Sequence, residues 1–296
     1  MPSSPATTLQ LKRPQRHIST RLATWVRRYN IALVAGFIFT SIVICTLAAP
    51  LLTPYDPSEM VLVNRFQPPS LAHPFGTDDF GRDVLSRVLY GGRTILLTGF
   101  SSVIISLTVG GSIGLVAAYW GSLTDDILMR VMDIVLSFPS VLLAILIVAA
   151  LGPGLSNALI AITASMIPVF ARLTRSIVVS LVQEEYVLAA RALGAPTNRI
   201  LAAHILPNML PPMIVQASAM LAVAIGTSTA LNFLGLGVEP PIPDWGLMVS
   251  DGQRLIFDAP HVPFFPGIVI TITVLSVNFI GDGLRDHLDP KLRGLG

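Results

Sequence analysis

Charge is scarce in this 296-residue sequence: only 12% of its residues are Asp, Glu, Lys or Arg, about half the share of a soluble domain. Five long runs contain no Asp, Glu, Lys, Arg or His; they lie between residues 28 and 56, 93 and 125, 133 and 172, 204 and 239, and 261 and 282. A soluble helix needs a polar face, and these runs supply none. The composition therefore predicts an all-α integral membrane protein.

The residues needed for several kinds of chemistry are also missing. Cys45 is the only cysteine, so neither an intrachain disulfide nor a cysteine-clustered metal site can form. The histidines are scattered, and the sequence contains no H-E-x-x-H, G-x-S-x-G or phosphate-loop pattern. We therefore predict that this chain has no catalytic residue, binds no metal or cofactor, and does not itself hydrolyse ATP.

Ionisable residues are absent from the five charge-free runs that make up the interiors of the predicted spans. Transporters that couple to an ion gradient commonly place such residues at mid-membrane, because these residues mark the ion path. An ion-coupled secondary transporter or channel remains the alternative, and uptake that collapses with the ion gradient would favour it. A membrane scaffold without a transport path is a third possibility, which uptake unaffected by deletion of the chain would favour.

The charge-free runs predict six transmembrane helices of about 20 residues each. The third run holds two of them, because Gly152-Pro153-Gly154 is a strong turn signal. The segment 121–132 is expected to be a short turn, and Pro139 and Pro168 are expected to kink the helices that contain them. The predicted spans cover residues 29–52, 94–119, 131–151, 155–179, 208–233 and 263–280.

The distribution of basic residues predicts the orientation. Residues 1–28 contain Lys and Arg but no acid, so the positive-inside rule keeps them in the cytoplasm. Six spans then return the C-terminus to the same side, and the acid-rich loop 236–260 is expected outside. The predicted domains are a basic cytoplasmic tail (1–28), a first span (29–52), an outside segment (53–93), a core of five helices (94–283) and a cytoplasmic tail (284–296).

The outside segment is predicted to contain a helix at the membrane interface, capped by Thr77 or Asp78. Asp83 and Arg87 are four residues apart and could pair on that helix. In the following span, Gly110 and Gly114 have the Gly-x-x-x-Gly spacing that lets a neighbouring helix approach closely. These two glycines are therefore predicted to lie at a helix–helix contact.

The most informative segment is the predicted loop 181–208 between the fourth and fifth spans. Gly194, followed by Ala195-Pro196, predicts the end of one helix, and Thr197 can cap a second that runs toward Pro207. One face of the first helix, with helical spacing, consists of Tyr186, Ala189, Ala190 and Leu193. Small side chains would let another protein approach the backbone, although an ordinary amphipathic connector is the alternative interpretation.

This loop resembles the cytoplasmic Glu-Ala-Ala loop of bacterial ABC importer permeases, whose pattern is E-A-A, three residues, Gly, nine residues, I-x-L-P. The matching positions are Ala189, Ala190, Gly194, Leu206 and Pro207. Leu188 replaces the Glu of that pattern and His204 replaces its Ile. Both departures are similar to the branch of the family that imports dipeptides, oligopeptides or nickel.

Three further blocks resemble the same permeases, so that the resemblance extends over residues 71–292. They are HPFGTDDFGRDVLSRVLYGGR (73–93), FLGLGVEPPIPDWGLMVSDG (233–252) and GDGLRDHLDPKL (281–292). The resemblance implies a type I ABC importer permease fold in the bacterial inner membrane, surrounded by lipid. It implies that the chain forms half of a translocation path for peptides.

The resemblance also implies partners. A second homologous permease would complete the path, two ATP-binding subunits using ATP and Mg would dock on the central loops, and a binding protein outside would deliver the substrate; nucleic acid has no role. In the loop, the expected contact face and turn consist of Tyr186, Ala189, Ala190, Leu193 and Gly194. Glu185 and Arg191 would add polar contacts, and Leu206 and Pro207 would begin the fifth span at a fixed angle.

Overall fold

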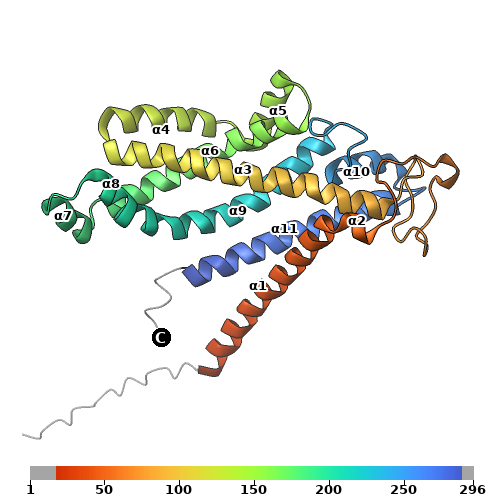
Figure 1. Cartoon of the computed structure of the whole chain (residues 1–296), viewed down its shortest axis with the longest axis horizontal. Coiled ribbons are helices and arrows are strands. Elements are labelled where there is room, and N and C mark those ends of the chain that lie inside the picture. Colours follow the sequence, from red (N-terminus) through yellow and green to blue (C-terminus); the bar gives the residue numbers. More distant parts are fainter. Residues whose placement is uncertain (1–17, 289–296) are drawn as a thin grey trace, which may run out of the picture.

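A computed structural model describes residues 18–288 of the chain, with side chains from residue 31 onward. The regular elements of this part are helices, so the predicted all-α fold is confirmed (Figure 1). The helices are α1 (Ile18–Leu47), α2 (Ala49–Leu52), α3 (Val84–Trp120), α4 (Ser122–Leu136), α5 (Ser140–Leu151), α6 (Leu155–Leu181), α7 (Glu185–Ala192), α8 (Thr197–Ile200), α9 (Leu206–Phe233), α10 (Trp245–Gly252) and α11 (His261–Leu288).

Four helical stretches among the described residues are long and apolar enough to cross a membrane: α3, α6, the continuous stretch Thr197–Phe233, and α11. The pair α4 and α5 passes the same test together but is bent by 89° at its break. The apolar part of α1, Ile31–Leu47, is shorter than the roughly 20 residues that a spanning helix needs. The total of six spans therefore stays a prediction.

Several helices extend beyond the predicted spans, because neighbouring segments join into longer helices. No separate interfacial helix precedes α3 in the described chain: Asp83 caps α3 by accepting from Ser86 N, and the helix continues unbroken to Trp120. Likewise α1 extends back into the predicted tail 1–28, and α11 extends to Leu288. Residues 1–17 and 289–296 of the predicted tails lie outside the described residues.

The third predicted span also differs from the expectation. The expected turn 121–132 is helical, because α4 begins at Ser122 directly after Gly121. Pro139 does not kink a continuous helix but precedes the first residue of α5, where its missing N–H leaves no hydrogen bond unmade. Pro168, by contrast, lies inside the continuous helix α6, as expected.

The helix pair α3 and α6 has the most extensive packing in the bundle. A Cβ atom on Gly110 would lie 2.4 Å from Ile167 O, and one on Gly114 would lie 2.2 Å from Ala171 O. Any larger residue would push the two helices apart, so both glycines are at a close helix–helix contact. The main apolar core, which includes Ile95, Phe170, Ile225 and Trp245, extends from this contact to α9 and α10.

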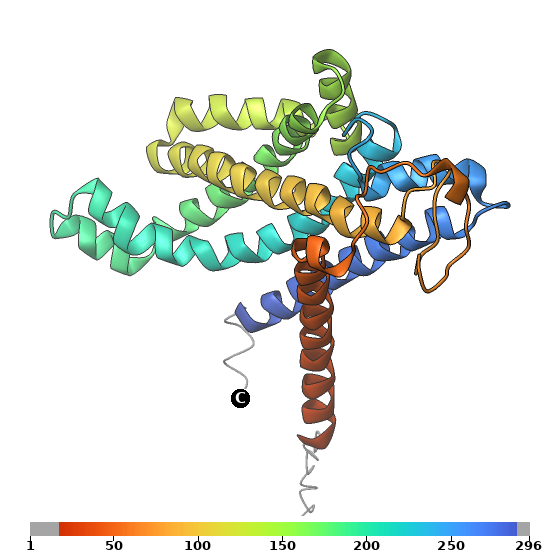
Figure 2. The same cartoon turned by 45° about the vertical axis from the view of Figure 1, so that its right-hand side comes forward.

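The first helix packs against α11 from Ala32 onward, and its N-terminal part projects from the bundle, as the turned view in Figure 2 shows. The Arg93 guanidinium donates to Thr46 O at 3.0 Å and to Leu47 O at 2.8 Å. These carbonyls end α1 and have no partner within the helix, so a cation suits them well. The contact fixes the end of α1 against the beginning of α3.

The long helices carry loops at two opposite ends of the bundle (Figure 1). We call residues 182–205, with α7 and α8, the α7 end. We call residues 53–93 and 234–260, which include α10 and the beginning of α3, the α10 end.

Candidate functional site

At the α7 end, the chain ends one helix and begins the next with a tight turn. Ala195 N donates to Ala190 O at 3.1 Å, and Gly194 N donates to Arg191 O at 3.0 Å. This pair of bonds is the Schellman motif, and Gly194 has the positive φ of 76° that the motif requires. The predicted end of the first helix is confirmed.

The beginning of the second helix differs in detail from the prediction. Pro196, and not Thr197, occupies the N-cap position, and no side chain caps the helix. From Thr197 the chain continues through one π-helical turn, Leu201–Ile205, into α9 without a break. Leu206 and Pro207 are therefore the first two residues of α9, and Pro207 replaces a backbone N–H with a ring at a position close to that turn.

One side of the loop is anchored to the spans by a small apolar cluster. Val187 from α7 and Ile200 from α8 are fully buried against Val178 of α6 and Met209 of α9. Burying such side chains stabilises the docked loop by about 1.5–3 kcal/mol each. Because the cluster connects α7 and α8 to two long helices, a displacement of the loop has to move those helices as well.

The other side of the loop is exposed and partly apolar. The Leu193 side chain at the turn is 88% exposed, and Tyr186, Leu188 and Leu206 are also exposed. Ala189, Glu185 and Arg191 share this exposed side, whereas Ala190 is half-buried against the anchoring cluster. The predicted contact face is thus divided: Tyr186, Ala189 and Leu193 are available to a partner, and Ala190 helps to hold the loop in place.

The α10 end contains a buried network of charged side chains. The Asp78 carboxylate accepts from Arg82 Nε at 2.6 Å, and Arg87 Nε lies 3.6 Å from Asp78 Oδ2. Asp83 accepts from Ser86 N and lies 2.9 Å from His73 Nδ1. The predicted Asp83–Arg87 pair is wrong, because Asp83 is the cap residue before the helix and Arg87 turns to Asp78.

The α10 helix begins on a buried carboxylate. Asp244 Oδ1 accepts from Gly246 N at 2.8 Å, while Oδ2 has no partner among the described residues. Burial raises the pKa of Asp244 to about 7, although the two backbone N–H groups lower it in part. Next to it, Trp245 Nε1 donates to Val88 O at 2.7 Å, which ties α10 to α3.

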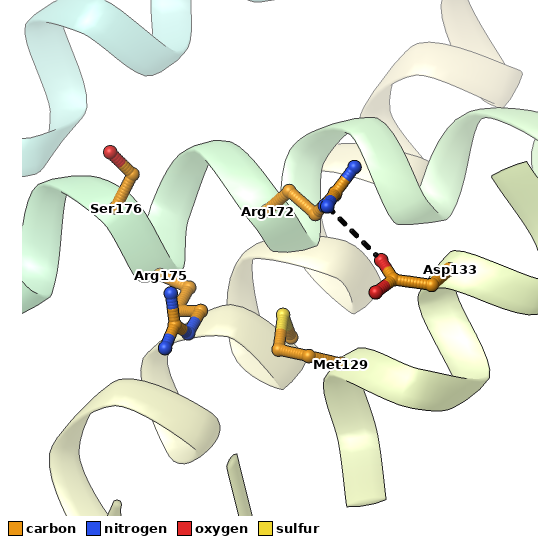
Figure 3. Close-up of a pocket in the computed structure, with 5 residues that line it drawn as sticks. All are labelled: Met129, Asp133, Arg172, Arg175 and Ser176. Carbon is orange, nitrogen blue, oxygen red and sulfur yellow. Dashed lines mark ion pairs between the residues drawn. The ribbon is translucent and has the colours of Figure 1, made fainter. Parts of the chain in front are cut away.

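Sequence reasoning did not pair the charged residues of α4 and α6. Arg175 donates to both carboxylate oxygens of Asp125, at 2.6 and 2.5 Å. Arg172 Nη2 lies 3.3 Å from Asp133 Oδ1 beside an open cavity (Figure 3). The spacing of the two arginines was visible in the sequence, but their partners are 39 and 50 residues away and only the fold brings them together.

Comparisons with known proteins decide the family. Residues 110–294 match the family described as binding-protein-dependent transport system inner membrane component. The chain belongs to this family of transport permeases. Residues 26–69 of the permease also match the N-terminal transmembrane domain of oligopeptide transport permease C. The permease is therefore a multi-pass inner-membrane component of a transport system, as predicted.

Named relatives are similar over nearly the whole permease. It is 49% identical over 268 residues to the dipeptide transport system permease protein DppC of Alkalihalophilus pseudofirmus. That alignment covers 90% of this chain and 88% of the relative. It is 44% identical over 272 residues to the di/tripeptide transport system permease protein DppC of Pseudomonas aeruginosa, in an alignment that covers 90% of each chain.

A solved structure shares the fold of the permease. A chain of the inward-facing MetNI methionine ABC transporter aligns with a TM-score of 0.55 at 20% identity, over 69% of this chain and 96% of that one. The predicted type I ABC importer permease fold is therefore confirmed. Part of this permease therefore has no counterpart in the aligned MetNI chain.

Proposed function

We propose that the permease forms half of a path that carries short peptides into the cell in an ATP-driven importer. The single observation that supports this best is the α7 end, where an exposed apolar turn is anchored rigidly to two long helices. Exposed apolar side chains on a fixed support are typical of a protein docking site. The dipeptide and di/tripeptide relatives support peptides as the substrate class.

In this proposal the α7 end faces the cytoplasm and an ATP-binding subunit docks on it. The chain crosses the membrane six times, with both termini in the cytoplasm, and the α10 end faces outside, where a binding protein delivers the peptide. A second homologous permease completes the path, and two ATP-binding subunits supply ATP and Mg. Movement of those subunits would push on α7 and α8 and, through Val187 and Ile200, on α6 and α9.

Co-purification tests the assembly. The permease is tagged, extracted gently from native membranes, and its companions are identified. A pair of ATP-binding subunits and a second permease support the proposal. Recovery of the chain alone or with copies of itself, together with uptake that collapses with the ion gradient, would instead indicate an ion-coupled transporter or channel.

A reporter test addresses the orientation. A reporter fused after Arg199 should be active in the cytoplasm, and one fused near Asp251 should be active outside. The opposite pattern at both positions would refute the proposed topology.

A further inference from the structure

One open cavity of the permease lies between α4 and α6 and does not belong to the docking loop. It has a volume of about 410 Å³ and is lined by Met129, Asp133, Arg172, Arg175 and Ser176 (Figure 3). Small-molecule sites commonly measure about 300–1,000 Å³, so the cavity is large enough for a small ligand. It is open to the surroundings of the chain and carries charges of both signs.

The two ion pairs beside this cavity differ in strength. Arg175 is bound to Asp125 by two short hydrogen bonds and is held in place. Arg172 and Asp133 meet only at 3.3 Å, and their side chains are 57% and 52% exposed. An exposed single contact of this kind contributes little to stability, so its partners can exchange for others at low cost.

The position of the pair in the helices indicates what it faces. Arg172 lies nine residues before the end of α6 at Leu181, about 14 Å along the helix axis. Charged side chains on a helix that crosses a membrane face water or protein and not lipid, because lipid would leave them unsolvated. The cavity therefore faces an aqueous path or a neighbouring subunit.

We propose that this cavity is a contact site for the two charged ends of a peptide inside the translocation path. The guanidinium of Arg172 would take the peptide carboxylate, and the carboxylate of Asp133 would take the peptide ammonium group. A lipid phosphate suits the site less well, because the carboxylate of Asp133 would repel it. The inference deepens the proposed function and rests on it.

The site is also placed to respond to the docking loop. Val178, which packs against Val187 of α7, lies one to two turns beyond Arg172 and Arg175 on α6. A movement of the loop that shifts α6 relative to α4 would change the distance between Arg172 and Asp133. In this way the site could bind a peptide in one state of the transporter and release it in another.

Accessibility of a single cysteine tests the site, because Cys45 is the only native cysteine. Two variants of the permease, both with Cys45→Ser, are assembled into the complete transporter. Met129→Cys places the thiol in the cavity, and Thr124→Cys is a control that is exposed on α4 outside the cavity. Both are treated with a charged, membrane-impermeant methanethiosulfonate in inside-out vesicles, with and without millimolar alanyl-alanine. Wild-type uptake of alanyl-alanine is measured first.

The expected result is that both thiols are labelled and that the dipeptide slows labelling of Met129→Cys at least threefold while Thr124→Cys is unaffected. Adding Arg172→Gln should abolish the protection, and Arg172→Lys should restore part of it. If the wild type takes up the dipeptide but Met129→Cys is unlabelled or unprotected, this site is refuted and the proposed function stands. If the wild type takes up no dipeptide, the proposed function fails and the site fails with it.

Discussion

The two ends of the bundle use their side chains in opposite ways. At the α10 end, charged groups such as Asp78, Arg82 and Arg87 are buried and bind one another within the chain. At the α7 end, apolar groups such as Leu193 and Tyr186 are exposed. Both ends carry sequence blocks that resemble the same family. A sequence block that resembles the family can therefore either stabilise the fold of the chain or form a surface for a partner. Only the structure shows which of these two roles a block has.

Substitution at the turn of the α7 end should have the largest effect. Gly194→Leu should abolish uptake, because a bulky side chain at the tight turn obstructs the docking surface, while the protein still inserts and folds. The measurement is uptake into vesicles that contain the complete transporter, alongside the amount of inserted permease.

A matched control separates docking from backbone strain. Gly235 has nearly the same φ as Gly194, 74° against 76°, and a Cβ at either position has open space around it. Gly235→Leu at the α10 end therefore carries the same strain and should keep most of the uptake. Equal uptake by the two variants would contradict the docking role. Ala190→Asp is a poorer test, because Ala190 packs against the anchoring cluster and a charge there would also disturb the loop.

Removal of a buried carboxylate at the α10 end should act on folding instead. Asp78→Ala removes the carboxylate that Arg82 and Arg87 share and leaves these buried arginines only the longer contact to Asp79 and the hydrogen bond to Pro57 O. Removal of one partner from a buried ion pair typically costs about 3–5 kcal/mol, and the remaining contacts place this change toward the lower value. The yield of folded permease and its thermal unfolding temperature in detergent should both fall. Asp78→Asn keeps an oxygen for Phe80 N and Arg82 N and should lose less. An Asp78→Ala variant as stable as the wild type would show that this end is not held together by its charges.

A pH-dependent stability change should follow from Asp244. Its pKa is raised by burial to about 7 from an ordinary value of 3.8, so between these values the folded state holds more protons than the unfolded state, and the free energy of unfolding falls as pH rises. Asp244→Asn removes this loss, and Asn also caps helices well. The free energy of unfolding of the variant should exceed that of the wild type by about 4 kcal/mol at pH 8 and by much less at pH 4.5. The measurement is the free energy of unfolding of both proteins between pH 4.5 and pH 8. If the two proteins changed in the same way with pH, the raised pKa of Asp244 would be contradicted.

The smallest effect is expected for an exposed pair at the same end. Arg254 Nη2 lies 3.5 Å from Asp79 Oδ2, and the Arg254 side chain is 69% exposed. Because solvent screens such a pair, Arg254→Ala should change the free energy of unfolding by less than about 0.5 kcal/mol. If Arg254→Ala lowered the free energy of unfolding as much as Asp78→Ala does, the exposure of a charged side chain would not indicate how much it contributes to stability.

The sequence predicted features that depend on local rules. The helix end at Gly194 follows from the turn chemistry of glycine, and the close contact at Gly110 and Gly114 agrees with their spacing. Features that depend on distant partners could not be predicted. Spacing alone suggested that Asp83 and Arg87 pair, but the tertiary fold brings His73 to Asp83 and Asp78 to Arg87.

The bend between α4 and α5 illustrates the same limit. A proline in an apolar run fits both a kinked helix and a break between two helices, and the structure has the break, with α4 and α5 both packed against α6. The charged pairs Asp125–Arg175 and Asp133–Arg172 depend on that packing and were therefore invisible before the fold was known.

The central claim, that the α7 end is completed by a partner and the α10 end by the chain itself, can be tested by one labelling experiment. Leu193→Cys and Val63→Cys, both in a Cys45→Ser background, place exposed thiols at the α7 and α10 ends, respectively. Each is labelled in the isolated permease and in the complex with its ATP-binding subunits. The account predicts that assembly protects Leu193→Cys and leaves Val63→Cys accessible. Unchanged labelling of Leu193→Cys on assembly, or protection of Val63→Cys in its place, would contradict it.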